Sequence, residues 1–207
     1  MELNVDTLYE LLRHVDLETF INICSMNKHI YSQCRSNLLL RKLYIEKKTD
    51  LFLEDIDAND PINSASAQGY ADIVDELISR GYIPTSKTVM SAYDNKHLNV
   101  VFRLLADPLI DPAFDNSFLL SHAGFRGNLP LVAFLLQHPR LSVTLKQLLT
   151  AIGFSEVTRE TASNEKDITT QTTILNLLDA YVRKTYPKFN LPPLPDRGNV
   201  RNLLKSV

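Results

Sequence analysis

The chain of 207 residues contains no tryptophan and only two cysteines, Cys24 and Cys34. It has no apolar run near the roughly 20 residues that a helix needs to cross a bilayer, and no charged leader followed by an apolar stretch at Met1. It also lacks an Asn-x-Ser/Thr glycosylation site. These absences predict an intracellular protein, cytoplasmic or nuclear, in which both cysteines are thiols, and no association with a membrane.

Charge of one sign is also scarce, because the net charge at pH 7 is only -2. Such a balance gives no general attraction to nucleic acid or to anionic membranes. One short basic cluster, without interleaved aromatic residues beyond Tyr44, keeps nucleic-acid binding as a minor hypothesis. Its members are Arg35, Arg41, Lys42, Lys47 and Lys48.

Three segments of the chain align with one another: residues 60–78, 88–105 and 119–136. Their offsets of about 27 and 31 residues are just below the period expected for short two-helix solenoid units. Each segment has an alanine in the same register, followed by two pairs of apolar residues. The alanines are Ala65, Ala92 and Ala123, and the pairs are Ile73/Val74 and Leu77/Ile78, Val100/Val101 and Leu104/Leu105, and Leu131/Val132 and Leu135/Leu136.

The repeated residue types fit a pair of helices. A small alanine lets the first helix approach its neighbour, while Gly69 and Gly127 can take the left-handed conformation that ends that helix. The apolar pairs, four residues apart, form one stripe on the second helix. Because a single unit cannot bury its stripe alone, we expect the units to stack on one another.

Residues 60–70, Asp-Pro-Ile-Asn-Ser-Ala-Ser-Ala-Gln-Gly-Tyr, resemble the ankyrin-repeat signature Pro-Leu-His-x-Ala-Ala-x-x-Gly-His. Ile62, Ala65 and Gly69 match it, whereas the later copies are degenerate and Lys96 replaces the glycine in the second. The shortened Asp-Pro connections are similar to those of divergent ankyrin-repeat proteins of large DNA viruses and some protists. The resemblance implies an all-α fold, an ankyrin-type helical solenoid of three to four degenerate repeats.

The copies also predict domain boundaries. We expect repeats over residues 60–185, preceded by a linker at 49–59 and followed by a Pro-rich extended tail at 186–207. The fourth unit carries a polar insertion, residues 156–170, which we expect to be an exposed loop or a helix extension. The four units are residues 60–84, 85–112, 116–143 and 144–185.

Residues 1–48 do not follow the repeat. The apolar spacing over residues 8–15 predicts one short amphipathic helix, and two more follow. Asp16 and Asn27 stand at the breaks, where side-chain caps are favoured. We therefore predict a small module of three helices.

Residues 3–16 resemble the beginning of an F-box, Leu-Pro-x-Glu-Leu-x-x-x-Ile-Leu-x-x-Leu-Asp, without a gap. Asn4 stands in place of the usual proline and Thr7 in place of an apolar residue, and no tryptophan follows near residues 38–43. The resemblance implies docking on a Skp1-like adaptor of a cullin-type ubiquitin ligase. The candidate docking residues are Leu3, Leu8, Leu11, Leu12, Val15 and Leu17.

Two other roles are open for these apolar residues. They can form the core of the module itself, or they can cap the end of the solenoid, which needs a cap whether or not a partner exists. Neither role requires a second protein.

One further set of residues has the types, but not the arrangement, of a reactive site. Cys24, His29 and Cys34 have the spacing of the last three ligands of a zinc knuckle, but Ile21 occupies the place of the first. The chain also has no Gly-x-Ser-x-Gly, phosphate-loop or His-Glu-x-x-His pattern. We therefore expect no metal, no cofactor and no enzymatic activity.

In an ankyrin-like unit, the variable positions near the end of the first helix face the concave groove and contact the target. Phe125 and Arg126 are large and not required by the repeat, so they are the leading anchors, although Phe125 can equally pack against the next unit. The predicted target-binding row is Ala67, Gln68, Asp94, Asn95, His122, Phe125 and Arg126.

Two functions fit these features. The first is a protein–protein interaction adaptor, a substrate receptor that binds Skp1 through residues 1–48 and a target through the repeats. The second is a structural or scaffold protein, for example a component of a viral particle, in which the N-terminal module only caps the solenoid.

Overall fold

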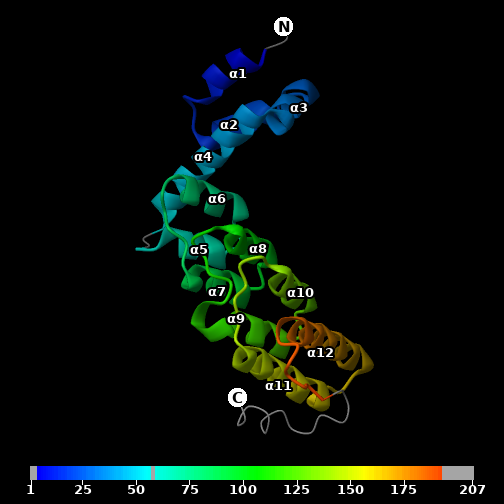
Figure 1. Cartoon of the computed structure of the whole chain (residues 1–207). Helices are drawn as coiled ribbons and strands as arrows, with labels where there is room; N and C mark the ends of the chain where they lie inside the picture. Colours follow the sequence, from blue (N-terminus) through cyan, green and yellow to red (C-terminus); the bar gives the residue numbers. More distant parts are fainter. Residues whose placement is uncertain (1–3, 57–58, 193–207) are drawn as a thin grey trace. The chain divides into compact units, whose positions relative to one another are not determined.

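The computed structural model describes residues 4–56 and 59–192, and in this part of the chain it contains twelve helices and no strand (Figure 1). The all-α prediction is therefore confirmed for the described residues. The chain divides into two compact units, Met1–Leu104 and Leu105–Val207. None of the helices described is both long enough and apolar enough to cross a bilayer.

Four helices begin the first unit: α1 (Val5–Leu12), α2 (Leu17–Ser25), α3 (Lys28–Ser36) and α4 (Leu38–Asp55). Each follows an Asn or Asp side chain that accepts a backbone N–H bond from the first turn. The predicted caps are confirmed, because Asp16 accepts from Thr19 N at 2.7 Å and Asn27 accepts from Ile30 N at 2.9 Å. The hydrogen bond from Thr19 also lowers the pKa of Asp16.

The fourth helix corrects two predictions. The module has four helices rather than three, and most of the predicted linker at 49–59 is the last part of α4, which continues to Asp55. Asn37 starts α4 by accepting from the backbone N–H groups of Leu39 and Leu40. No Pro or Gly interrupts residues 38–55, so nothing in the sequence ends the helix at residue 48.

The predicted helix pairs are present in the first unit as α5 (Pro61–Ala67), α6 (Ala71–Ser79), α7 (Ser86–Asp94) and α8 (Leu98–Ala106), the last of which extends two residues into the second unit. Helices α5 and α7 pack against each other, as the sequence register predicts. Ala65 and Ala92 are fully buried on them. Asn63 Oδ1 accepts a hydrogen bond of 2.7 Å from Ser91 Oγ between the two helices.

The same turn follows the first helix of three pairs. Gly69, Lys96 and Gly127 all have left-handed backbone, with φ of 77°, 66° and 69°. In each copy the next residue donates its N–H to the carbonyl of the repeated alanine, at 3.0, 2.9 and 2.8 Å. The aligned positions of the sequence therefore share one local backbone geometry, even where lysine replaces glycine.

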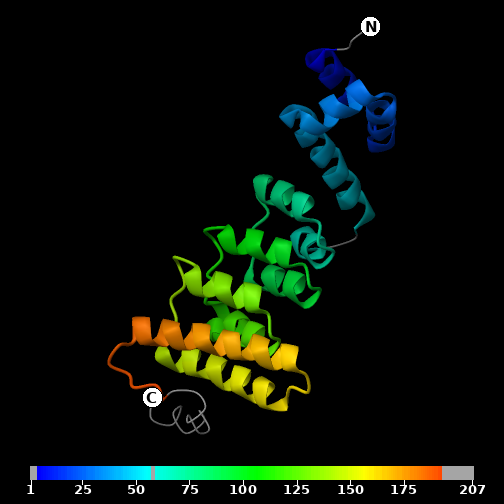
Figure 2. The same ribbon diagram turned by 90° about the vertical axis from the view of Figure 1, so that its right-hand side faces the viewer.

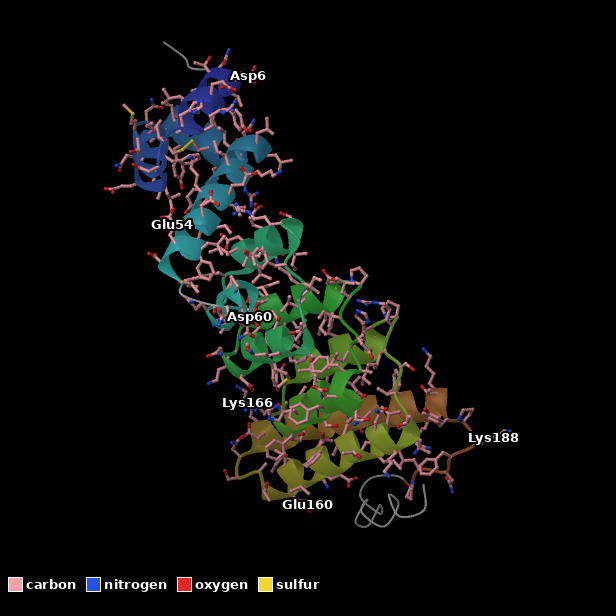
Figure 3. All side chains as sticks on the ribbon, turned by 90° about the vertical axis from the view of Figure 1, so that its left-hand side faces the viewer. Asp6, Glu54, Asp60, Glu160, Lys166 and Lys188 are labelled. Atoms are coloured by element: carbon pink, nitrogen blue, oxygen red, sulfur yellow. A yellow bond between two sulfur atoms is a disulfide. The ribbon has the colours of Figure 1, made fainter. Side chains whose placement is uncertain are left out.

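The second unit contains α9 (Phe114–Phe125), α10 (Leu129–Gln137), α11 (Leu145–Thr161) and α12 (Glu165–Thr185). Helices α11 and α12 lie side by side along their length (Figures 1 and 2). The predicted insertion is an extension of these helices, not a loop, because only residues 162–164 separate them. Figure 3 marks Glu160 near the end of α11 and Lys166 near the start of α12.

Two polar contacts organise the loops of this unit. Arg140 donates four hydrogen bonds of 2.7–2.9 Å to carbonyl oxygens in the connection at residues 105–110. The first residues of the predicted tail pack on the unit, since Leu191 is buried and Tyr186 Oη donates to Val143 O at 2.7 Å. The rest of the tail prediction, residues 193–207, lies outside the described residues.

Candidate functional site

The residues predicted to dock on an adaptor do not form one exposed face. Leu8 and Leu12 are 0% exposed and belong to the core of α1–α4, so their assignment to a docking surface is wrong. Val15 packs against the same core. Leu11 is 47% exposed. Leu17 is partly buried and Leu3 lies outside the described residues.

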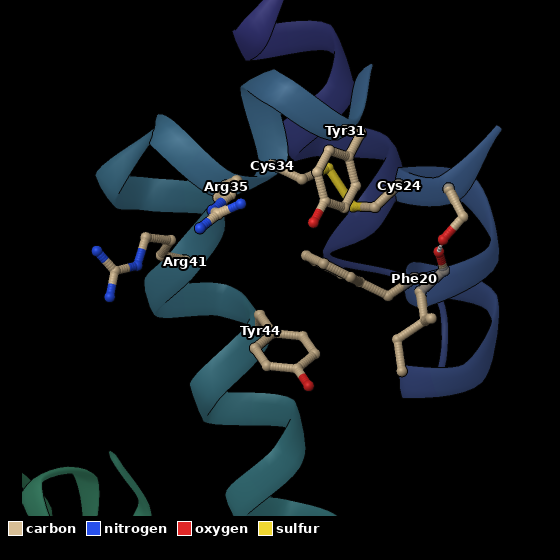
Figure 4. Close-up of a pocket in the computed structure, with 9 residues that line it drawn as sticks. Phe20, Cys24, Tyr31, Cys34, Arg35, Arg41 and Tyr44 are labelled. Carbon is tan, nitrogen blue, oxygen red and sulfur yellow. Dashed lines mark hydrogen bonds between the residues drawn. A yellow bond between two sulfur atoms is a disulfide. The ribbon is translucent and has the colours of Figure 1, made fainter. Parts of the chain in front are cut away.

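A pocket of about 420 Å³ lies instead between α2, α3 and α4 (Figure 4). Its aromatic walls are Phe20, Tyr31 and Tyr44, and the rings of Phe20 and Tyr44 are 5.8 Å apart. Arg35 and Arg41 lie together on one side of the pocket in Figure 4. The pocket thus combines apolar walls with two guanidinium groups.

The wall next to Tyr31 is a disulfide bond between Cys24 and Cys34, whose Cα atoms are 6.0 Å apart (Figures 3 and 4). The prediction of two free thiols is therefore wrong, and the cysteine content no longer supports a reducing compartment. A sequence signal for the bond exists. Cys24 follows buried Phe20 by four residues and Cys34 follows buried Ile30 by four, so both cysteines lie on the inner faces of α2 and α3.

The basic cluster considered for nucleic acid is largely committed to contacts within the protein. Lys42 pairs with Glu46 at 3.7 Å. Lys47 donates to the carbonyl oxygens of Arg13 and Val15. The cluster therefore does not form a continuous free basic surface.

Lys48 forms an ion pair with Asp72 at 2.7 Å, and its ammonium group also lies 5.4 Å from the centre of the Tyr70 ring. Burial alone would raise the pKa of Asp72. The hydrogen bond and the charge of Lys48 lower this pKa by more than burial raises it, so the pKa lies below its ordinary value. This pair joins α4 to α6 within the first unit. Arg80, the residue directly after α6, adds a second link at 2.7 Å to Asp50 of α4.

The predicted target-binding row divides between the two units. Ala67 and Gln68 lie at the end of α5, and Asp94 and Asn95 at the end of α7. Because α5 and α7 pack together, these four residues belong to one pair of neighbouring helices. All are small or polar, and Asn95 Nδ2 already donates to Ser91 O at 2.8 Å.

The remaining three residues lie on α9, where they form part of a larger aromatic surface. His122 stacks on the ring of Phe118 at 5.2 Å and is followed by Phe125 at 6.4 Å. Phe125 then meets Phe154 of α11 edge-on at 6.2 Å. The four residues Phe118, His122, Phe125 and Phe154 are called the α9/α11 aromatic surface below.

Three phenylalanines of this surface remain about half exposed, at 47% for Phe118, 47% for Phe125 and 48% for Phe154. Phe125 contacts Phe154 of the next helix pair and is also exposed to solvent, and its role as a target anchor stays a prediction. Arg126 borders the surface and donates from Nε to His122 Nε2 at 3.2 Å. Phe118 and Phe154 were not predicted as site residues, although neither is explained by the repeat.

The backbone under the aromatic surface is fixed by contacts between helices. Thr158 Oγ1 of α11 donates to Phe125 O at 3.1 Å, and Gln171 Nε2 of α12 donates to Gly124 O at 3.0 Å. Gly124 itself is packed closely, since an added Cβ would lie 2.6 Å from Ser155 Oγ. The backbone that carries the exposed rings is therefore held in place by α11 and α12.

In residues 4–56 and 59–192, no three His, Cys, Asp or Glu side chains are close enough together to hold a metal ion. The two features with recognition chemistry are the pocket of α2–α4 and the α9/α11 aromatic surface. Comparison with known proteins finds no match to a family model, to a curated protein or to a solved structure.

Proposed function

We propose that this chain is a non-enzymatic adaptor that binds one protein through its N-terminal helices and a target protein through the α9/α11 aromatic surface. The observation that carries the proposal is the continuous ring contact among half-exposed phenylalanines on α9 and α11. Contiguous exposed apolar groups of this kind are typical of interaction sites. Aromatic and arginine side chains are also the usual anchors of protein interfaces.

The rigidity of this surface supports the same function. Ring stacking and the hydrogen bonds from Thr158 and Gln171 restrict the side chains and the backbone before a partner arrives. A surface that is already ordered loses little conformational entropy on binding. Phe125 and Phe154 are therefore the strongest candidates for the centre of the interface.

For the first partner we retain a Skp1-like adaptor, which the F-box-like pattern at residues 3–16 suggests. Since Leu8 and Leu12 are buried, the contact would depend on the exposed apolar residues that remain on the N-terminal helices. They include Leu11, Leu38 and Leu39, and Met26 directly after α2 is exposed as well.

A structural role is the second candidate, and the links between α4 and α6 favour it. The Lys48–Asp72 and Arg80–Asp50 pairs attach the N-terminal helices to the first helix pair, as a cap requires. In that case the chain would be a scaffold component, and it would purify with a particle at fixed stoichiometry without recruiting a ligase.

The target surface is tested by affinity capture from cells with the wild type and with F125S/F154S. We expect the variant to capture at least tenfold less of the target protein than the wild type, because two interface anchors are removed. The matched control is I83S/L109S, which replaces two other exposed apolar residues that lie outside the aromatic surface. Equal capture by wild type and F125S/F154S would contradict the proposed target site.

The ligase hypothesis is tested with purified Skp1 in a pull-down. Wild type is expected to bind, and L38S/L39S is expected to bind at least tenfold more weakly if these exposed leucines form the contact. Absence of Skp1 binding by the wild type would leave the scaffold role as the better account.

A further inference from the structure

The pocket of α2–α4 has a buried floor and an open rim. Phe20 is only 3% exposed, and disulfide-bonded Cys24 beside it is also buried. Tyr31 at the rim, in contrast, is 52% exposed. Ile21, the neighbour of Phe20, also lines the pocket and is exposed. An apolar side chain that enters the pocket would contact the aromatic rings and the disulfide at its floor. The residues on either side of that side chain would remain at the protein surface.

The charged side of the pocket differs from the other basic positions of α3 and α4. Arg35 and Arg41 have no carboxylate partner within 4.0 Å among the described residues, whereas Lys42, Lys47 and Lys48 on α4 all have polar partners. Two arginines from different helices therefore line the same side of one apolar space (Figure 4). Guanidinium groups bind carboxylates strongly because they donate two parallel hydrogen bonds.

We infer that this pocket binds an acidic peptide segment of a partner protein, with an aromatic or aliphatic side chain seated on Phe20 and flanking carboxylates held by Arg35 and Arg41. The inference deepens the proposed function by giving the chemistry of the first partner, and it applies whether or not that partner is Skp1. The net charge of -2 gives the whole chain no attraction for an acidic peptide. Binding of such a peptide therefore requires the positive charges of the pocket itself.

The open rim favours a peptide over a small molecule. Sites for small ligands bury most of the ligand surface, whereas exposed Ile21 and Tyr31 leave a path for a chain to enter and leave the pocket. A nucleic acid is less suited, because the three neighbouring lysines that would follow a phosphate backbone are engaged within the protein.

The test measures binding of the full chain to the fluorescein-labelled peptide Asp-Glu-Asp-Phe-Leu-Glu-Asp-Glu by fluorescence polarisation. Two control peptides replace either all acids by their amides or Phe-Leu by Ser-Ser. We expect both controls to bind roughly tenfold more weakly or worse, because each lacks one half of the recognition chemistry. Raising the salt concentration is expected to weaken the binding of the acidic peptide but not the binding of its amide form.

The decisive variant is R35Q/R41Q, with K28Q/K42Q as its matched control. Both remove one positive charge from α3 and one from α4, but only the first pair lines the pocket. R35Q/R41Q is expected to lose at least tenfold in affinity, and K28Q/K42Q to stay within about twofold of wild type. Circular dichroism checks that both variants keep the helical fold, and Y31S supplies a second variant that removes an exposed wall without touching the charges.

Several results would overturn the inference. These are absence of saturable binding up to about 1 mM peptide, equal affinity of R35Q/R41Q and wild type, tighter binding of N-acetylphenylalanine than of the peptide, or tighter binding of a single-stranded oligonucleotide. Each outcome differs from failure of the proposed target site, which is read from F125S/F154S in the second unit.

Discussion

The four N-terminal helices and the helix pairs that follow them are stabilised in different ways. Helices α1–α4 each begin at an Asn or Asp cap, and a disulfide joins α2 to α3. The pairs instead repeat one left-handed turn and one buried alanine. Stability in the first region therefore depends on particular side-chain bonds, whereas in the second it depends on backbone shape at equivalent positions.

The two regions also expose different chemistry. The pocket on α2–α4 presents two arginines without ion-pair partners among the described residues, whereas the α9/α11 aromatic surface presents stacked rings and a histidine. The first is suited to acidic partners at low salt, and the second to apolar partners whose affinity depends little on salt. A protein with both surfaces can bind two different partners without competition for one site.

The largest effect is expected from G69A, which tests the backbone account of the helix pairs. An added Cβ would clash with the imidazole ring of His97, and Gly69 has φ of 77°. We expect the free energy of unfolding to fall by about 3 kcal/mol, from strain and steric conflict together. Urea denaturation followed by circular dichroism measures the change.

Gly81 provides the control for this change, because it has φ of 94° but no atom within 4 Å of an added Cβ. G81A should therefore show only the conformational cost, about 1 kcal/mol. Equal destabilisation by G69A and G81A would show that the clash of the added Cβ with His97 contributes nothing.

Removal of the disulfide is the corresponding change in the N-terminal helices. The bond closes a loop of sequence separation 10, for which loss of the cross-link is expected to cost about 3 kcal/mol. C24S/C34S should lower the urea midpoint of the first unit, and a reducing agent should do the same to the wild type. If reduction leaves the midpoint unchanged, the bond does not stabilise these helices.

Part of this fold could be predicted from the sequence. The alanine register and the apolar pairs predicted α5–α8 because helical spacing directly encodes which face is buried. The same spacing marked Leu8 and Leu12 as apolar, but it could not distinguish a core from a docking face, because both require an apolar stripe. That distinction depends on which helices pack over the stripe, and the fourth of these helices, α4, was not predicted.

The two candidate sites were partly predictable for the same reason. His122, Phe125 and Arg126 were named because they occupy variable positions of the repeat, whereas Phe154 joins them only through the packing of α11 on α9. The pocket forms only where three helices meet, so no local pattern predicted that Arg35 and Arg41 would line the same pocket.

A smaller effect of opposite sign is expected at Lys96, the only one of the three equivalent turn positions without glycine. K96G should raise the free energy of unfolding by about 1 kcal/mol, because glycine adopts φ of 66° without the steric cost of a Cβ. Asn95, whose φ is -87°, is the matched control. N95G should be neutral or destabilising in the same urea titration, and stabilisation by both changes would contradict the turn argument.

The smallest effect is expected from D72N, which breaks the link between α4 and α6. The side chains of Lys48 and Asp72 are 31% and 37% exposed, so at pH 7 the loss should be about 1 kcal/mol or less. Because the folded-state pKa of Asp72 is lowered, its contribution is present above 3.8, the ordinary value, and disappears as the pH falls through the folded-state pKa. Stability of wild type and D72N should therefore differ at pH 7 and converge once the pH falls below the folded-state pKa of Asp72.

K48Q gives an independent measure of the same pair. If the ion pair joins α4 to α6 as the geometry indicates, D72N and K48Q should be non-additive in a double-mutant cycle at pH 7. Additive losses would mean that each charge acts alone. The attachment of the N-terminal helices would then depend on the Arg80–Asp50 pair and on the edge-on contact of Phe52 with Tyr70 at 5.9 Å, and the structural role of these helices as a cap would have less electrostatic support.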